Sequence, residues 1–187
     1  MSEATKELLA IEGVEAASPD IGRALWMLEE GRRRTKARVA GLDPAAIDWA
    51  PAPGENSIGA LLYHIPAIEA DWLYAEVLEE PFPPELAALF PDDVRDDHGQ
   101  LARHPGDDLA THFRRLDAVR VRLLAVFGTM SGDEFRRVRD LPDYGVTPEW
   151  VVHHLLQHEA EHRGEIGTLR MLFERTGAVP AVAPQPR

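Results

Sequence analysis

The sequence predicts an all-α protein, a four-helix bundle with a long crossover loop between its second and third helices. Two observations support this prediction: four long segments repeat apolar residues at helical spacing, and no segment has a convincing strand pattern. The 187 residues are enough for one domain with a proper hydrophobic core. Four amphipathic helices in one domain bury their apolar faces against each other, which is the arrangement of a bundle.

The first helix is expected to begin at Ser18-Pro19-Asp20. Serine is a common N-cap, proline fits the first helical position, and an early aspartate complements the helix dipole. The apolar residues at helical spacing are Ile21, Leu25, Leu28, Val39 and Leu42. The connection that follows is rich in Pro and Gly, with room for one short turn of helix from Pro44.

The second helix is expected to start after Ser57, another N-cap, and to run through SIGALLYHIPAIEADWLYAEVLEE. Its apolar stripe consists of Ile58, Leu61, Ile65, Ile68 and Trp72. Pro66 lies inside this helix and removes one backbone hydrogen bond, so a bend is expected nearby. Residues 81–106, rich in Pro, Asp and Gly, are predicted to form the long loop, and loops of this length are usually functional or mobile.

The third helix is predicted over residues 107–129. One of its faces carries Leu109, Phe113, Leu116, Val119, Leu123 and Phe127. The fourth helix is predicted to begin at Thr147, an N-cap followed by a proline and an acidic first turn. It should end near Arg175, because Gly177 is a typical helix terminator.

These elements divide the chain into three parts. We expect an N-terminal extension over residues 1–17, the helix bundle over residues 18–176, and a disordered, Pro-rich tail over residues 177–187.

Composition narrows the classes of function. A formal net charge of −12 opposes nucleic-acid binding, and the basic run at residues 31–38 is expected to be a solvated helix face. The chain has no cysteine, which excludes disulfides, thiolate metal sites and a cysteine nucleophile. The N-terminus lacks the pattern of a signal peptide, and no apolar segment approaches the roughly 20 residues of a membrane helix. We therefore expect a cytoplasmic protein without membrane contact.

Histidines form the most informative pattern. The stretch HHLLQHEAEHRGEI, residues 153–166, holds four of the eight histidines in the chain. His158 and His162 are four residues apart in the row of the fourth helix that faces the interior, close enough to share one metal ion. His64 belongs to the inward stripe of the second helix. Three inward imidazoles are costly to bury unless something binds their lone pairs, so the pattern favours a metal site.

The remaining histidines have weaker patterns. His154 precedes His158 by four residues and also points roughly inward, so its participation stays open, as does that of Glu161. His98, His104 and His112 fall in the predicted loop or on a mostly charged helix face, and no role is assigned to them.

Residues 158–162 also match the H-E-x-x-H motif of zinc peptidases, in which Glu159 would act as general base. The metzincin class would have glycine and histidine where this chain has Glu165 and Thr168. A downstream glutamate could still supply a third ligand, but the chain offers no sheet edge along which to align a peptide substrate. We therefore predict that the protein is not a peptidase.

The order and spacing of two segments resemble the DinB superfamily over residues 18–175. The matching residues are Trp49, Ser57-Ile58-Gly59 and His64 in the first segment, then His158, His162, Arg163 and Gly164 in the second. The resemblance implies a left-handed four-helix bundle in which His64, His158 and His162 bind one divalent metal ion. Two departures are Glu161, where many members have histidine, and Glu165, where glutamine is common, so the charge around the metal differs.

The better understood members of the family imply a chemistry. They are metal-dependent transferases that join a low-molecular-weight thiol to an electrophile, or isomerases that use such a thiol. The resemblance thus implies a transferase with a small thiol and an electrophile as its partners, and no catalytic residue beyond the metal ligands is assigned. Zinc is the first choice, and nickel, iron or manganese also suit imidazole ligands. A metal-dependent hydrolase and a non-enzymatic metal-binding stress protein stay open as alternatives.

The resemblance also implies a homodimer. Leu62, Leu73 and Leu156 fall off the predicted core stripes, and exposed apolar residues of this kind would need cover from a partner.

Overall fold

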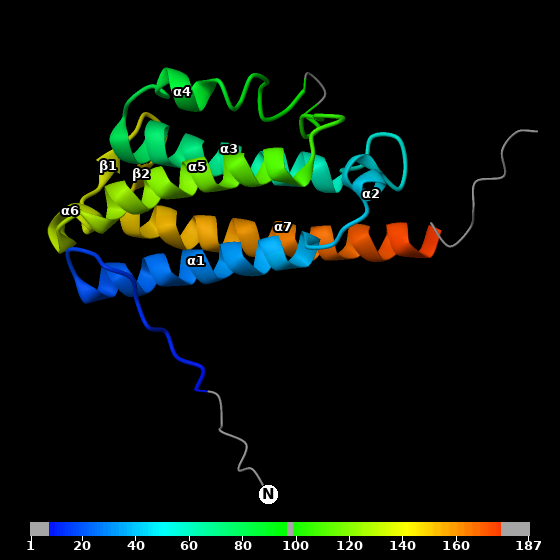
Figure 1. Ribbon diagram of the computed structural model, residues 1–187. Helices are drawn as coiled ribbons and strands as arrows, with labels where there is room; N and C mark the ends of the chain where they lie inside the picture. The colour runs from blue at the N-terminus through cyan, green and yellow to red at the C-terminus, as the bar shows by residue number, and fades with distance from the viewer. Residues whose placement is uncertain (1–7, 97–98, 177–187) are drawn as a thin grey trace, which may run out of the picture.

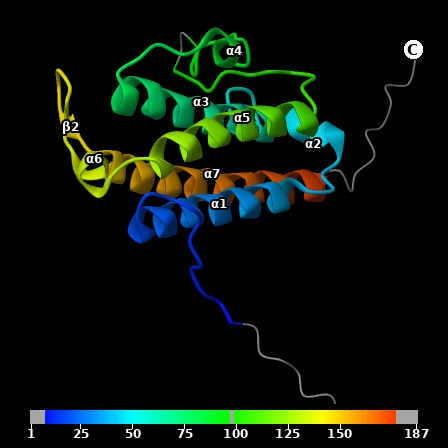
Figure 2. The ribbon, with the colours of Figure 1, turned by 60° about the vertical axis from the view of Figure 1, so that its left-hand side comes forward.

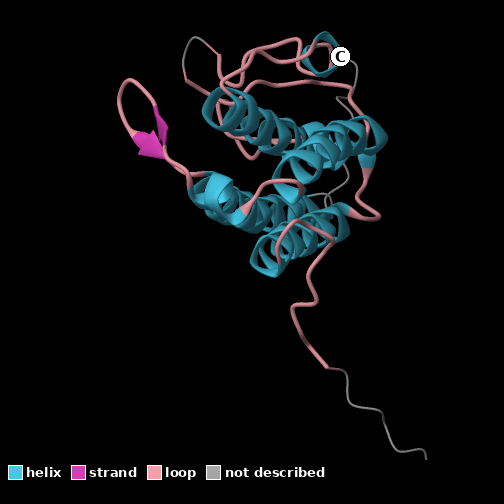
Figure 3. Cartoon of the chain, turned by 90° about the vertical axis from the view of Figure 1, so that its left-hand side faces the viewer, coloured by secondary structure: helices cyan, strands magenta, loops and turns pink. Residues whose placement is uncertain are grey.

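The computed structural model describes residues 8–96 and 99–176, and it confirms the all-α bundle (Figure 1). Two helices, α1 and α7, form one layer, and α3 and α5 form the other (Figures 1 and 3). The long elements are α1 (Pro19–Val39), α3 (Ile58–Asp71) continued by the π-helix η1 (Trp72–Leu78), α5 (Leu109–Gly128) and α7 (Pro148–Thr176). Within the described residues no helix combines the length and apolar character needed to cross a membrane.

Side-chain caps start two of the predicted helices as expected. The hydroxyl of Ser57 accepts a hydrogen bond from the backbone N–H of Ala60 at 3.1 Å, and that of Thr147 accepts one from Trp150 at 3.1 Å. Ser18 does precede α1, but its hydroxyl donates to the carboxylate of Asp20 and caps no backbone group. The position of Ser18 therefore predicted the start of α1 correctly, although its hydroxyl bonds a side chain in place of the backbone N–H group that an N-cap bonds.

Helix α3 continues through Pro66, and from Trp72 on seven residues adopt the wider π form. The π segment ends at Glu79, which has a left-handed backbone with φ of 56°. Apolar side chains cover almost every side of α3, which is typical of a fully buried helix. The long loop that follows lies over its outer face, where the Tyr63 hydroxyl donates to the carbonyl of Asp92 at 2.8 Å.

This burial removes one reason to expect a homodimer. Leu62 and Leu73 are 0% exposed in the single chain, and Leu156 is partly buried against the core. The expectation that Leu62 and Leu73 need a partner was wrong, because the single chain already covers them. The homodimer stays a prediction based on the family alone.

The short elements lie at the ends of the bundle and in its long loop. Helix α2 (Pro44–Asp48) forms the turn expected from Pro44, and α4 (Pro84–Ala87) is a single turn in the loop. Helix α6 (Gly132–Arg136) leads into a hairpin that pairs β1 (Arg139–Asp140) antiparallel to β2 (Gly145–Val146) and projects beside the bundle (Figures 2 and 3). The expectation that the chain has no strand was therefore wrong for this hairpin. Its two-residue strands are too short to show an alternation of apolar and polar residues in the sequence.

The last residues of the N-terminal extension, from Val14 to Ala17, pack against the bundle. The backbone N–H of Val14 donates to the carbonyl of Gly22, and that of Ala17 donates to the carbonyl of Gly128. The predicted C-terminal tail lies outside the described residues, as do residues 1–7.

The hydrophobic core has two parts with a polar layer between them. One apolar cluster surrounds Leu25, Leu73 and Phe127, and the other surrounds Val39, Leu61 and Ile166. The buried polar side chains between these clusters are Arg32, Thr35, His64, Glu69, Arg120 and Glu159. Because a buried polar group is costly unless it is bonded, this layer is where a functional site is expected.

Candidate metal centre

The three predicted histidines meet between the two layers of the bundle. His64 comes from α3, and His158 and His162 come from successive turns of α7. The Nε2 atom of His158 lies 3.1 Å from that of His64 and 3.1 Å from that of His162. Ligand atoms of all three residues lie within 4.8 Å of one another. Helical spacing on two separate helices has therefore brought three imidazoles to one point.

This geometry fits a metal ion better than it fits hydrogen bonding. An imidazole Nε2 holds either one proton or one lone pair, so His158 can bond only one of its two neighbours in this way. In a tetrahedral zinc site with Zn–N distances of about 2.0–2.1 Å, neighbouring ligand atoms lie about 3.3 Å apart. The two Nε2–Nε2 distances from His158, both 3.1 Å, are close to that spacing, so His64, His158 and His162 could hold a divalent ion.

The carboxylate of Glu165 contacts His162 at Nδ1, the ring nitrogen that faces away from the other two histidines. His162 Nδ1 lies 3.2 Å from Glu165 Oε2, and the amide of Asn56 donates to Glu165 Oε1 at 2.8 Å. With Nδ1 protonated and donating to Glu165, Nε2 of His162 keeps its lone pair for a metal. Glu165, one of the two departures from the family pattern, thus lies directly behind the candidate site.

Burial keeps two of the imidazoles neutral. Desolvation, with smaller effects from His158, His162 and Arg95, lowers the pKa of His64 to about 3. Desolvation, reinforced by His162 and His154, lowers the pKa of His158 to about 4. A neutral imidazole is the form that binds metal, so both rings are ready to coordinate at pH 7.

Neither residue left open by the sequence joins the three nitrogens. The ring of His154 packs against two indoles, with centroid distances of 4.6 Å to Trp72 and 5.1 Å to Trp150, and its centroid lies 6.0 Å from that of His158. Glu161 is exposed. Within the part of the chain that the structure describes, the candidate metal group consists of the three predicted histidines.

Glu159, the glutamate of the H-E-x-x-H motif, points away from this group and into the bundle. Its carboxylate accepts hydrogen bonds from Arg32 Nε at 2.9 Å and from Arg120 Nη2 at 3.0 Å. A glutamate paired with two buried guanidinium groups is not available as a general base. This contact supports the prediction that the protein is not a peptidase.

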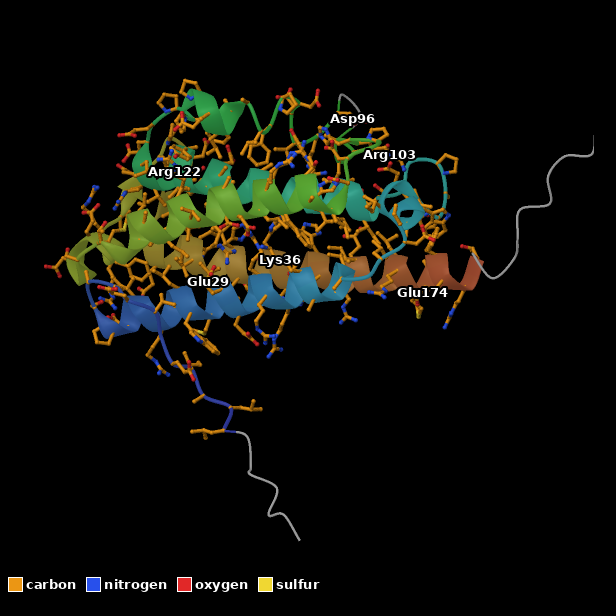
Figure 4. The ribbon with its side chains drawn as sticks, viewed as in Figure 1. Glu29, Lys36, Asp96, Arg103, Arg122 and Glu174 are labelled. Atoms are coloured by element: carbon orange, nitrogen blue, oxygen red, sulfur yellow. The ribbon has the colours of Figure 1, made fainter. Side chains whose placement is uncertain are left out.

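Glu159 belongs to a buried ionic network, a ring of two arginines and two glutamates: Arg32, Glu69, Arg120 and Glu159. Each layer of the bundle supplies one arginine and one glutamate, and each of the four residues is at most 4% exposed. The guanidinium groups also donate to the carbonyls of Leu116 and Leu28. Glu29, labelled in Figure 4, accepts from Arg120 at 3.0 Å at the exposed edge of the network.

The sequence interpretation missed this network. The basic run at residues 31–38 was expected to be solvated, which is wrong for Arg32. A signal was present, because each network residue follows a buried apolar residue by four positions and therefore shares its inward face. The pairs are Leu28 and Arg32, Ile65 and Glu69, Leu116 and Arg120, and Leu155 and Glu159.

The histidines without an assigned role differ in their environments. His98 lies outside the described residues. The His104 ring stacks on Tyr63 with a centroid distance of 3.6 Å. His112 was expected on a charged face, but it is 0% exposed, and neither of its ring nitrogens has a hydrogen-bond partner among the described residues. The pattern was misleading because the long loop and α2, which bring His104 and Asp48 close, cover this side of α5.

The residues shared with the family also have structural reasons. A side chain at Gly59 would place its Cβ 3.2 Å from the carbonyl oxygen of Ile47, so glycine there lets α2 pack closely on α3. Trp49 packs edge-on against Phe173, and Arg163 donates to the carbonyl of Gly31 at 3.2 Å. These contacts tie the helices that carry the three histidines to their neighbours.

The fold and the three imidazoles define a class: a four-helix bundle whose interior offers a candidate site for one divalent metal ion. Comparison with protein families gives the same result from the sequence side, because the model of the DinB superfamily matches residues 27–166, well over half of the chain. The chain belongs to the DinB superfamily. No curated protein matches it.

Proposed function

We propose that this protein is a metal-dependent transferase that activates a low-molecular-weight thiol for attack on an electrophile. The observation that supports the proposal most is the convergence of three imidazole Nε2 atoms without a protein carboxylate or thiolate among them. Such a ligand set leaves a divalent ion its full charge and open positions, which is typical of catalytic sites. Zinc is the first candidate, followed by nickel, iron and manganese.

The residues of the chain have distinct roles in this proposal. His64, His158 and His162 would hold the ion, and Glu165, fixed by Asn56, keeps the His162 ring oriented. When bound, the metal supplies a positive charge that converts a coordinated thiol into its thiolate, the nucleophilic form. The chain itself has no cysteine that could occupy the open position. His158 and His162 are partly exposed, which is consistent with access for a small molecule.

A thiol titration tests this proposal. Cobalt-loaded protein is expected to develop a sulfur-to-metal charge-transfer absorption when a small thiol is added, because thiolate is a better ligand than water. The absorption should strengthen as the pH rises toward about 8.5, the ordinary pKa of a thiol, and should be lost in His162→Ala.

The alternatives predict a different spectrum. If cobalt binds but a range of cellular thiols leaves the spectrum unchanged, the transferase proposal is wrong. A metal-dependent hydrolase or a non-enzymatic metal-binding protein would then describe the site better.

A further inference from the structure

Four arginines gather around a hollow between α1 and α7, on a chain whose net charge is −12. This arginine hollow has a volume of about 550 Å³. Its lining residues are Arg34, Ala37, Arg38, Arg163 and Arg170. A volume of this size is within the range of small-molecule sites, and the lining is suited to an anion.

Neutral backbone groups hold two of these arginines in place. Arg163 Nη1 donates to the carbonyl of Gly31 at 3.2 Å, and Arg170 Nη1 donates to the carbonyl of Arg38 at 2.8 Å. A carbonyl fixes the position of a guanidinium group but does not neutralise its charge. The positive charge is therefore positioned before any ligand arrives, which lowers the entropy cost of binding.

Carboxylates compensate only part of the charge. Glu30 accepts from Arg34 at 2.7 Å, and Glu174, labelled in Figure 4 near the end of α7, accepts from Arg170 at 2.9 Å. Among the described residues, neither Arg38 nor Arg163 has an ion-pair partner. The hollow thus retains two uncompensated positive charges.

The guanidinium group of Arg38, one of the lining residues, lies close to the backbone of α7. A Cβ atom built on Gly167 of α7 would lie 3.5 Å from Arg38 Cζ. The side chain of Arg38 therefore crosses from α1 to lie against the surface of α7, where the glycine leaves room for it.

We propose that the arginine hollow binds a small anion that carries phosphate groups. Guanidinium groups present paired N–H donors that match the oxygens of a phosphate, and several of them together suit an anion of more than one charge. A small ligand is favoured over nucleic acid, because the strongly negative chain repels an extended polyanion.

The arginine hollow is separate from the candidate metal centre. Arg163 follows His162 in the sequence, and successive residues of a helix point about 100° apart. Arg163 reaches α1 through Gly31, whereas His162 meets His64 of α3 at the centre between the layers. The proposal does not depend on the proposed transferase function.

Calorimetric titration of the full chain with pyrophosphate and inorganic phosphate, at constant ionic strength, tests the proposal. We expect saturable binding of pyrophosphate that is about tenfold weaker, or weaker still, in Arg38→Gln/Arg163→Gln, because two charged donors are lost. The matched control is Arg114→Gln/Arg122→Gln, which removes the same charge from exposed positions on α5 and should bind as the natural chain does.

Three results would overturn the proposal. One is equal binding by the natural chain and the Arg38→Gln/Arg163→Gln variant, and another is no saturable binding at all. The third is binding that survives this double substitution but disappears in His162→Ala, which would place the anion at the metal centre. Circular dichroism of each variant verifies that the bundle is intact.

Discussion

Two polar clusters share the middle layer of the bundle, and they differ in whether their polar groups can all be hydrogen-bonded within the cluster. In the buried ionic network, two arginines and two glutamates sum to zero charge and bond one another around a ring. In the candidate metal centre, three imidazole Nε2 atoms face each other, and at least one pair cannot form a hydrogen bond. The ionic network, whose charges are paired within the cluster, is suited to stabilising the fold. The candidate metal centre, whose ring nitrogens are not all hydrogen-bonded, is suited to binding a ligand.

The pKa values reflect the same contrast. Burial alone would raise the pKa of Glu69, but the guanidinium groups of Arg120 and Arg32 lower it below its ordinary value. In the candidate metal centre, burial lowers the pKa of His64, and the neighbouring His158, His162 and Arg95 lower it further. The network therefore keeps Glu69 charged, and the candidate metal centre keeps His64 neutral.

The largest effect on stability is expected from breaking the network. Glu159→Gln leaves two buried arginines with one buried carboxylate, that of Glu69, which should lower the free energy of unfolding by about 3–5 kcal/mol. Urea denaturation measures this change. The matched control is Glu161→Gln, two residues further along the same helix at an exposed position, and it should leave the stability unchanged. Equal stability of the two variants would show that the network is not structural.

A smaller effect is expected behind the metal centre. Glu165→Ala removes the acceptor for His162 Nδ1, which should weaken metal affinity by about 10–100-fold, as loss of such outer partners typically does. Competition with a chromophoric chelator measures the affinity. Glu161→Ala should leave it unchanged, since Glu161 lies outside the three-nitrogen group. A loss with Glu161→Ala in place of Glu165→Ala would mean that the outer carboxylate is assigned wrongly.

The smallest effect concerns pH and His112, which belongs to neither cluster. Burial lowers the pKa of His112 to about 4, so between pH 6.5 and 4 the unfolded chain binds a proton that the folded chain does not. Stability should therefore fall as the pH falls through this window. In His112→Leu the slope should flatten, as chemical denaturation at several pH values would reveal.

The control for this prediction is His153→Gln, at an exposed histidine of α7, which should retain the slope of the natural chain. At pH 7 the leucine variant should be at least as stable, because it removes two buried ring nitrogens that have no partner among the described residues. An unchanged slope in His112→Leu would contradict the pKa of about 4.

Sequence patterns predicted the four long helices and the meeting of the three histidines for the same reason. Caps such as Ser57 and Thr147 and the apolar spacing are local properties, and His64, His158 and His162 lie on faces that this spacing identifies. Which histidines meet was therefore accessible from helical periodicity together with the bundle.

The features that were missed depend on tertiary contacts. Arg32 and Glu69 are charged, and a charged residue is assigned to the surface unless its partner on another helix is known. The π-helix after Asp71 and the two-residue strands of the hairpin leave no periodic pattern in the sequence. His112 was placed on a charged face because the cover provided by distant segments cannot be read from α5 alone.

Metal analysis of single-histidine variants tests the central claim most directly. The natural chain should contain close to one divalent ion per chain, and His64→Ala should lose it while the fold, followed by circular dichroism, stays intact. His154→Ala, which removes the histidine that packs against Trp72 and Trp150, should keep the metal. Equal metal content in the natural chain and in His64→Ala, or loss of metal in His154→Ala alone, would contradict the proposed centre.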